Sequence, residues 1–285
     1  MKKFSLSNAA LKNIAYMTML IDHFFAVAFT EFIRQRAAAG YETDTLIEIR
    51  QTGRAVGRIA FVLFAYLIVE GFVHTRSRSK YLLRLTIFAF VSEIPFDLAF
   101  SGQVIDNTGQ NIFFTLSISV LVLIVWEWAA SCVGMLHHTK EPRDIYWHIC
   151  VRVFRGVQLG ALFLGCFTAY VFHVDYRFMG VPLIFTFYIL RNKPHYIQIV
   201  PAACVMFLGT WILNYQKYVG VESPALIFRF SMRELYGLFA FVPIALYDGT
   251  RGRPFPKAVY YGFYPVHLLL LHGIAEMIKA GQLVM

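Results

Sequence analysis

The sequence has few charged residues. Only 15% of its 285 residues are Asp, Glu, Lys or Arg, whereas 58% are apolar and 17% are aromatic. Soluble domains carry about 25% charged residues, so this composition argues against a water-soluble globular protein. It favours a chain that places much of its surface against lipid.

Signature motifs of several enzyme classes are also missing. There is no GxxxxGK[ST] phosphate loop, no GxGxxG turn, no HExxH helix and no GxSxG elbow. Their absence argues against an ATP-driven pump, a dehydrogenase, a zinc protease and a serine hydrolase of those types. We expect no metal ion, because the spacing of the cysteines is not that of metal ligands. We expect them to pack as small buried apolar residues. They are Cys132, Cys150, Cys166 and Cys204.

Apolar segments long enough to cross a bilayer recur along the chain. A spanning helix needs about 20 predominantly apolar residues. The sequence therefore predicts an all-α fold, a polytopic integral membrane bundle of about nine helices, with eight to ten possible because two segments are short. We expect residues 1–285 to form a single domain. The segments run from Leu11 to Phe32, Arg54 to Val73, Leu82 to Phe100, Asn111 to Gly134, Val153 to Phe172, Phe178 to Leu190, Tyr196 to Tyr215, Glu234 to Tyr247 and Ala258 to Ile278.

Basic residues concentrate in alternate connections between these segments. By the positive-inside rule, this pattern predicts a multi-pass protein of the bacterial cytoplasmic (inner) membrane, with a cytoplasmic N-terminus, an uncleaved first helix and an outer C-terminus. The lipid bilayer is the expected partner, and nucleic acid is not, because the basic residues flank membrane spans. The inner basic residues are Lys2, Lys3, Arg76, Arg78, Lys80, Arg84, Lys140, Arg143, Arg152, Arg191, Lys193, Arg251, Arg253 and Lys257.

Several ionisable residues lie within the predicted helices. A charge at the bilayer centre costs roughly 3 kcal/mol on insertion scales, so such residues usually face a bundle interior or a cavity. The helical rise of about 1.5 Å per residue places them at a similar depth, toward the outer side. They are Asp22, His23, Arg54, Arg58, Glu93 and Asp97.

His23 is the best candidate for chemistry. A histidine is suited to take a proton from an attacking amine or hydroxyl, and the adjacent Asp22 can orient it. His267 is a second candidate, with Tyr264 on the same helical face. The alternatives are ion pairs that only fix helix packing and a hydrogen-bonded core histidine; for His272 we expect packing alone.

The inner basic loops HTRSRSKYLLR and DGTRGRPFPK allow two interpretations. Positive-inside topology explains their charge by itself. Clustered arginine with Gly and Ser also suits a phosphate-rich cofactor on the cytoplasmic face.

Segments spread along nearly the whole chain resemble successive signature blocks of the TraX family. They are LKNIAYMTMLIDHF, GRIAFVLFAYLIVEGFVHTRSRSKYLLRLTIFAFVSEIPFDLAF, NIFFTL, DYRFMGVPLIFTFYILR and GRPFPKAVYYGFYPVHLLLL. The resemblance implies membrane acetyl transfer from acetyl-CoA, with the N-terminal amine of a conjugative pilin as acceptor. The matching polar positions are Asp22, His23, Arg58, the segment from Glu70 to Lys80, Arg84, Glu93, Asp97 and His267.

Together these features predict an acetyl-CoA-dependent acetyltransferase acting on an amine or hydroxyl. His23, aided by Asp22, would be the base, Arg58 or Tyr264 would stabilise the oxyanion, and Glu93 would hold an ammonium or brace Arg58. The alternatives are a proton-coupled secondary transporter with Asp22, His23 and Glu93 as its relay, and a structural subunit of a secretion or conjugation apparatus. The predicted catalytic residues are His23, Asp22, Arg58, Glu93, Tyr264 and His267, and the predicted acetyl-CoA phosphate ligands are Arg76, Arg78, Lys80, Arg84, Arg251 and Arg253.

Overall fold

The computed structural model describes residues 5–139 and 145–282, and all regular structure in these ranges is helical apart from isolated bridges. The all-α architecture is therefore confirmed. The elements are α1 (Asn8–Ala26), α2 (Ala28–Ala38), α3 (Asp44–His74), α4 (Arg78–Ser101), α5 (Ile112–Thr139), α6 (Ile145–Val171), η1 (Arg177–Met179), α7 (Gly180–Ile189), α8 (His195–Tyr218), α9 (Pro224–Met232), η2 (Arg233–Ala240), α10 (Phe241–Ala245) and α11 (Lys257–Lys279).

The predicted count of about nine spanning helices is not confirmed. Within the described ranges, six helical segments are long and apolar enough to cross a membrane: α1 with α2, then α3, α5, α6, α8 and α11. The predicted third span forms α4, a complete helix that is more polar than a typical span. The predicted sixth span forms η1 with α7, and the predicted eighth forms η2 with α10, which directly continue α9. Neither is among the six candidate spans.

The long loop expected between the first two spans is mostly helix. The structure continues α1 through α2 to Ala38 and begins α3 at Asp44, so the connection is a short turn. The polar residues of this region lie on helical segments that extend beyond the apolar stretch. At about 1.5 Å per residue, α3 is about 46 Å long, whereas the hydrocarbon layer is about 30 Å thick.

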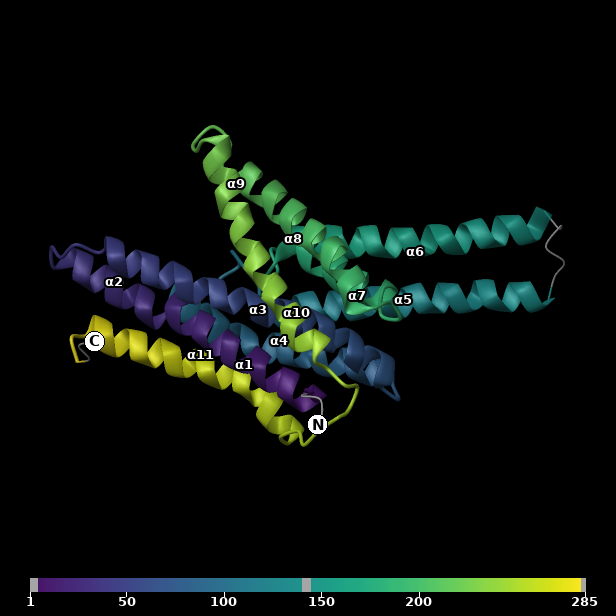
Figure 1. Ribbon diagram of the computed structural model, residues 1–285, viewed down its shortest axis with the longest axis horizontal. Helices are drawn as coiled ribbons and strands as arrows, with labels where there is room; N and C mark the ends of the chain where they lie inside the picture. The colour runs from purple at the N-terminus through teal and green to yellow at the C-terminus, as the bar shows by residue number, and fades with distance from the viewer. Residues whose placement is uncertain (1–4, 140–144, 283–285) are drawn as a thin grey trace.

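The helices form a central bundle with two projecting arms (Figure 1). α1, α2, α3 and α11 run alongside one another, and the C-terminal end of α11 packs against α2. The α5–α6 hairpin projects away from this group, and α8 with α9 forms another arm. α6 has few buried residues, which is typical of a lipid-facing helix.

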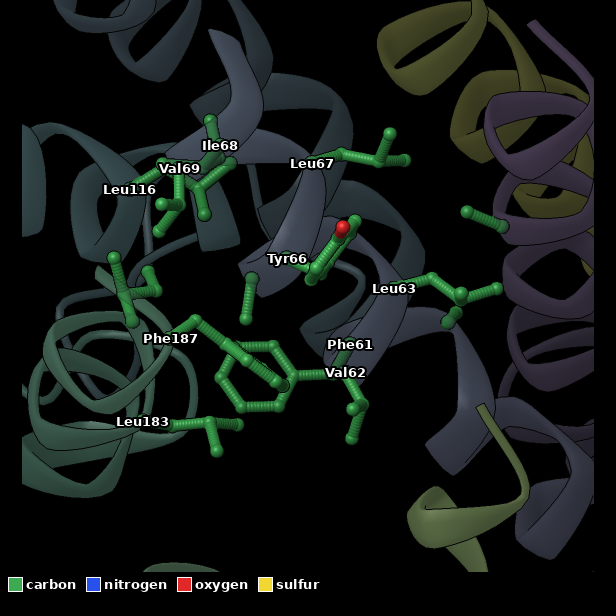
Figure 2. Packing of buried hydrophobic residues seen from close by; sticks show 14 of the residues in the cluster. Phe61, Val62, Leu63, Tyr66, Leu67, Ile68, Val69, Leu116, Leu183 and Phe187 are labelled. Carbon is green, nitrogen blue, oxygen red and sulfur yellow. The ribbon is translucent and has the colours of Figure 1, made fainter. Parts of the chain in front are cut away.

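α3 is the axis of the core. A run of its side chains from Ala60 to Val69 is buried almost without interruption. Figure 2 shows Phe61 and its neighbours on α3 facing Leu183 and Phe187 of α7, with Leu116 of α5 beside Val69. A helix that is apolar on all sides is one that other helices surround.

α1 and α3 pack closely through glycines. A Cβ atom on Gly53 would lie 2.0 Å from the Phe25 ring, and a Cβ on Gly57 would lie 2.2 Å from Cβ of Asp22. The two glycines of α3 therefore let α1 approach closely, as small residues do in membrane helix pairs. This contact turns Asp22 into the protein.

Two basic loops lie at one end of the bundle, which we call the basic end: the α3–α4 turn and the segment after α10, beside Leu6. Lys2 and Lys3 lie outside the described residues. Leu6 N donates to the Leu246 carbonyl at 2.7 Å, and the Tyr247 hydroxyl donates to Glu70 at 3.1 Å. Through these bonds the segment after α10 lies beside both the chain start and α3.

The cysteines are free thiols in the described residues. Cys204 is exposed and the other three are half-buried. The prediction that they pack as small buried residues is therefore wrong for Cys204, which lies on the outside of the bundle.

Replacing Gly57 with alanine should force α1 and α3 apart. We expect a loss of about 1 to 3 kcal/mol in unfolding free energy, because the added methyl group collides with Asp22. Denaturant titration in detergent micelles measures it. Gly160→Ala on α6 is the matched control, since no atom lies within 4 Å of its added Cβ; it should be neutral or stabilising by up to about 1 kcal/mol. Equal losses in both variants would contradict the packing.

Candidate functional site

A small cavity of about 40 Å³ lies where α1, α3 and α11 meet the start of α5 and the connection after α6. Its volume holds little more than one or two water molecules. Both polar and apolar side chains line the cavity. The lining residues are Met19, Asp22, His23, Gly57, Ala60, Phe61, Phe64, Ile112, Asp175, Tyr176 and Tyr264.

His23 and His267 form a hydrogen-bonded pair at this cavity. Nδ1 of His23 lies 2.7 Å from Nε2 of His267, and the two rings are within 3° of parallel. Nδ1 of His267 lies 2.7 Å from the carbonyl oxygen of Phe263. A carbonyl only accepts, so His267 carries its proton on Nδ1 and accepts from His23 through Nε2. His23 therefore uses its Nδ1 proton in this bond, which leaves its Nε2 lone pair as the basic site.

Aromatic rings fix the position of the pair. Phe100 and Tyr264 meet the His23 ring edge to face, at centroid distances of 5.5 Å and 5.9 Å. Phe263 stacks on His267 at 4.9 Å. Both histidine rings are buried, His23 with 9% and His267 with 4% of its surface exposed. This packing restricts the imidazoles to one orientation.

The arginines of α3 pair with acids on two different elements. Nε of Arg54 lies 3.3 Å from Oδ1 of Asp22, and Nε of Arg58 lies 3.1 Å from Oε1 of Glu234 on η2. The Asp22 oxygen faces Arg54 without a well-directed hydrogen bond. Asp22 thus neutralises Arg54, and the group that orients His23 is His267 instead of Asp22.

Glu93 is held by the residue that precedes α5. The backbone N–H of Asn111 donates to Oε2 of Glu93 at 3.2 Å, and the Asn111 side-chain amide donates to the same oxygen. That amide also donates to the Ala89 carbonyl at 2.7 Å. Glu93 therefore braces the start of α5, and it does not pair with Arg58. Asp97 accepts from the Asp106 N–H at 2.9 Å and lies outside the cluster.

The segment after α6 enters the site with unusual backbone angles. His173, Tyr176 and Arg177 have φ values of 51°, 59° and 44°, although none of them is glycine. Such strain persists only where surrounding contacts over-determine it, and it clusters at functional sites. Asp175 N donates to the Gln110 carbonyl at 2.8 Å, and Tyr176 stacks on Phe61 at 3.5 Å.

Asp175 is the acid that this strained segment carries to the cavity. Its Oδ1 accepts from the Tyr176 N–H at 3.0 Å, and it forms no ion pair with any residue in the described ranges. Burial raises the pKa of the Asp175 carboxyl to about 6, and the nearby Arg58 guanidinium acts in the opposite direction. Near neutral pH this carboxyl therefore changes its protonation readily.

The structure brings together most of the residues predicted to be catalytic. His23, Asp22 and Tyr264 line the cavity, His267 contacts His23, and Arg58 and Glu93 lie in the surrounding layer. Their catalytic role remains a prediction. The site also holds polar members that were not predicted as site residues. Three of them begin the signature segments NIFFTL and DYRFMGVPLIFTFYILR, but they lie outside the apolar interior of the spans. These members are Asn111, Asp175, Tyr176 and Glu234.

The predicted phosphate ligands lie at the basic end, about 26 Å along α3 from Gly57 by helical rise. Arg78 is already engaged: it forms an ion pair with Glu127 and lies 4.8 Å from the Phe72 ring centroid. Nε of Arg84 is buried without a hydrogen-bond partner in the described structure. The remaining predicted ligands have exposed side chains that face solvent. They are Arg76, Lys80, Arg251 and Arg253.

Comparison with known proteins gives one family and one similar curated protein. Residues 7–275 match the family described as TraX protein, which confirms the resemblance drawn from the signature segments. A probable fimbrial assembly protein, FimC of serogroup H1 from Dichelobacter nodosus, is 26% identical over 227 residues, covering 76% of this chain and 80% of that protein. No solved structure matches the chain significantly.

Asp175 should make stability depend on pH in a defined direction. Its folded-state pKa of about 6 lies above the unfolded value of 3.8, so the folded protein binds this proton more tightly. The unfolding free energy should therefore fall between about pH 4 and pH 6, by at most about 3 kcal/mol, and then level off. Denaturant titrations in detergent across this range should show the fall in the wild type and a smaller one in Asp175→Asn.

The exposed Glu276→Gln variant is the control, and it should retain the wild-type pH profile. If Asp175→Asn also retained that profile, the carboxyl would not be buried as the structure places it.

Proposed function

This chain belongs to the TraX family, and from that premise we propose that it is a membrane-embedded acetyltransferase. It moves an acetyl group from cytoplasmic acetyl-CoA to an amine or hydroxyl acceptor at or across the membrane. The family implication for the acceptor is the N-terminal amine of a pilin. The name of the FimC relative, a probable fimbrial assembly protein, supports an acceptor that belongs to a surface filament.

The hydrogen-bonded pair of His23 and His267 is the observation that carries this proposal. The chain from His23 through His267 to the Phe263 carbonyl leaves Nε2 of His23 as a base. A base oriented by a second group is the arrangement that activates a nucleophile for acyl transfer. In this arrangement His267 is a positioning residue, because it acts through His23.

The transfer step uses groups that line the same cavity. The acceptor heteroatom gives a proton to Nε2 of His23 and attacks the thioester carbonyl carbon. The new bond to carbon forms, the carbon–sulfur bond breaks, and the thiolate takes the proton back from Nε2 of His23. The Tyr264 hydroxyl is the better placed of the two predicted oxyanion donors, because it lines the cavity whereas Arg58 is paired with Glu234.

The distance between the basic loops and the cavity limits how acetyl-CoA can bind. Arg76, Lys80, Arg251 and Arg253 are exposed together at the basic end and suit a phosphate-rich group. The cavity lies about 26 Å from that end by helical rise and its volume is about 40 Å³. A thioester therefore reaches His23 only when helices around the cavity move apart, and the donor phosphates sit between the basic loops and not beside the histidines.

His23→Gln should abolish acetyl transfer while the protein stays folded. Removing a general base lowers rates by about 10² to 10⁴-fold. Membranes containing the protein are supplied with radiolabelled acetyl-CoA, and the radioactivity incorporated into envelope molecules is measured. His272→Gln is the matched control on α11, half-buried and away from the cavity. Full labelling by a folded His23→Gln protein would reject the proposed base, and proton-coupled substrate uptake without labelling would indicate a transporter.

His267→Gln should lower the rate only through His23. We expect a loss of at least about tenfold, because the tautomer of His23 is no longer fixed. The double variant His23→Gln/His267→Gln should then be no slower than His23→Gln alone, since residues that act as a unit are not additive. Rates from the same labelling assay decide the matter; additive losses would show that His267 has a separate role.

A further inference from the structure

We propose that the groove between the C-terminal ends of α2 and α11 binds an anionic phospholipid, with the lipid phosphate on Arg36 and Lys279. The groove has a volume of about 260 Å³, several times that of the cavity at His23. It lies at the end of the bundle opposite the basic end, where α11 reaches the end of α2 (Figure 1). This binding is independent of any enzymatic activity.

The groove combines apolar and cationic side chains. Ile278 is buried, and Phe32 packs against the buried residues that join α2 to α11. Arg36 is half-buried and Lys279 is exposed. No acid is among the described residues that line the groove. The ligand that matches this wall has an anionic group attached to an apolar body.

Two aromatic rings hold the guanidinium group of Arg36. Its central carbon lies 4.5 Å from the ring centroid of Tyr41 and 5.5 Å from that of Phe32. Among the described residues its side chain has no ion-pair partner, whereas Arg34 on the same helix pairs with Glu31 at 2.7 Å. The ring contacts orient the guanidinium and leave its N–H donors for a ligand. A guanidinium forms two parallel hydrogen bonds with a phosphate.

The acids near the groove do not neutralise it. Both carboxylate oxygens of Glu31 accept from side chains of α2 outside this ring pair. Glu276 lies 3.3 Å from Lys279, but both side chains are largely exposed, so water weakens their attraction. The acids of the α2–α3 turn, Glu42 and Asp44, are exposed to solvent. The groove therefore carries a surplus of positive charge.

The backbone at this end does not oppose an anion strongly. A helix C-terminus carries partial negative charge on its free carbonyls. Each of the two helices is followed by a glycine with positive φ, 81° at Gly40 and 70° at Gly281. Their N–H groups donate to the carbonyls of Ala37 and Ile278, both at 3.0 Å. The returning chain thus occupies carbonyls of both last turns.

The depth of the groove fits the headgroup level of a leaflet. α11 begins beside the basic end and ends at Lys279, and it rises by about 33 Å over this length. The hydrocarbon layer is about 30 Å thick. A helix that begins in one headgroup region therefore ends in the other. Exposed apolar side chains of α11, among them Leu270 and Met277, provide a surface for the lipid chains.

Size and charge narrow the ligand further. Pockets for small ligands begin at about 300 Å³, so a groove of about 260 Å³ holds a headgroup while the chains lie outside it. Phosphatidylglycerol has a net negative charge that suits the surplus at Arg36. Phosphatidylcholine carries a cation that offsets its phosphate, and we expect it to bind more weakly.

The test measures bound lipid directly. Protein purified in detergent is given equal amounts of phosphatidylglycerol and phosphatidylcholine with the same chains, and native mass spectrometry counts the lipids on each molecule. We expect phosphatidylglycerol to be preferred. Arg36→Gln should weaken the binding of one phosphatidylglycerol by about five- to tenfold, because a basic residue near an anionic headgroup is lost. Anionic lipids also reach the basic end, so the difference between variants is the result that counts.

Arg34→Gln is the matched control, because it removes the same charge from the same helix outside the groove. It should bind phosphatidylglycerol as the wild type does. Lys279→Gln, on the other helix, should weaken the binding by about two- to fivefold, and it decides the matter if Arg36→Gln does not fold. Glycerol phosphate, which has the phosphate without the chains, should not displace the lipid at equal concentration.

Three results would overturn the site. The first is equal phosphatidylglycerol binding by Arg36→Gln and Arg34→Gln, which would place the lipid elsewhere. The second is equal binding of phosphatidylcholine, which would indicate an unselective lipid contact. The third is displacement by glycerol phosphate, which would indicate a site for a free phosphate compound instead of a lipid.

Discussion

The close approach of α1 to α3 is the contact on which the site depends. Gly53 and Gly57 let Phe25 and Asp22 rest directly on the α3 backbone. That approach brings Asp22 to Arg54 and leaves His23 facing α11, where His267 meets it. In a bilayer, helix association depends on packing and polar contacts more than on the hydrophobic effect. Residues larger than glycine at positions 53 and 57 would therefore move Asp22 away from Arg54.

The sequence revealed the helical class because apolar periodicity is strong in long spans such as α3 and α5. Its count of about nine crossings is not confirmed, because hydropathy does not show whether a segment such as Arg177–Ile189 crosses the bundle or ends inside it. It also placed a loop where α2 and the start of α3 continue. Charged residues beyond the hydrocarbon layer look like a loop in a hydropathy profile, although they form helices equally well.

The site was predictable where polar residues interrupt apolar helices. Asp22, His23, Arg58, Glu93 and His267 are conspicuous for this reason. Their pairing was not predictable, because it depends on side-chain directions and on elements distant in sequence, such as η2, which supplies Glu234 to Arg58. Asp175 lies in a connection, where an acid is ordinary in sequence and only the fold shows it turned inward.

The helical continuation of α2 and α3 beyond the apolar stretch limits which molecules reach the cavity. From the start of α3 at Asp44 to Gly57 the helix rises about 20 Å, and an extended polypeptide covers that distance with about six residues. A folded partner halted at the α2–α3 turn would touch the cavity only through a flexible end of at least that length. On the proposed function, an acceptor that approaches from this turn therefore needs an unfolded end of at least about six residues.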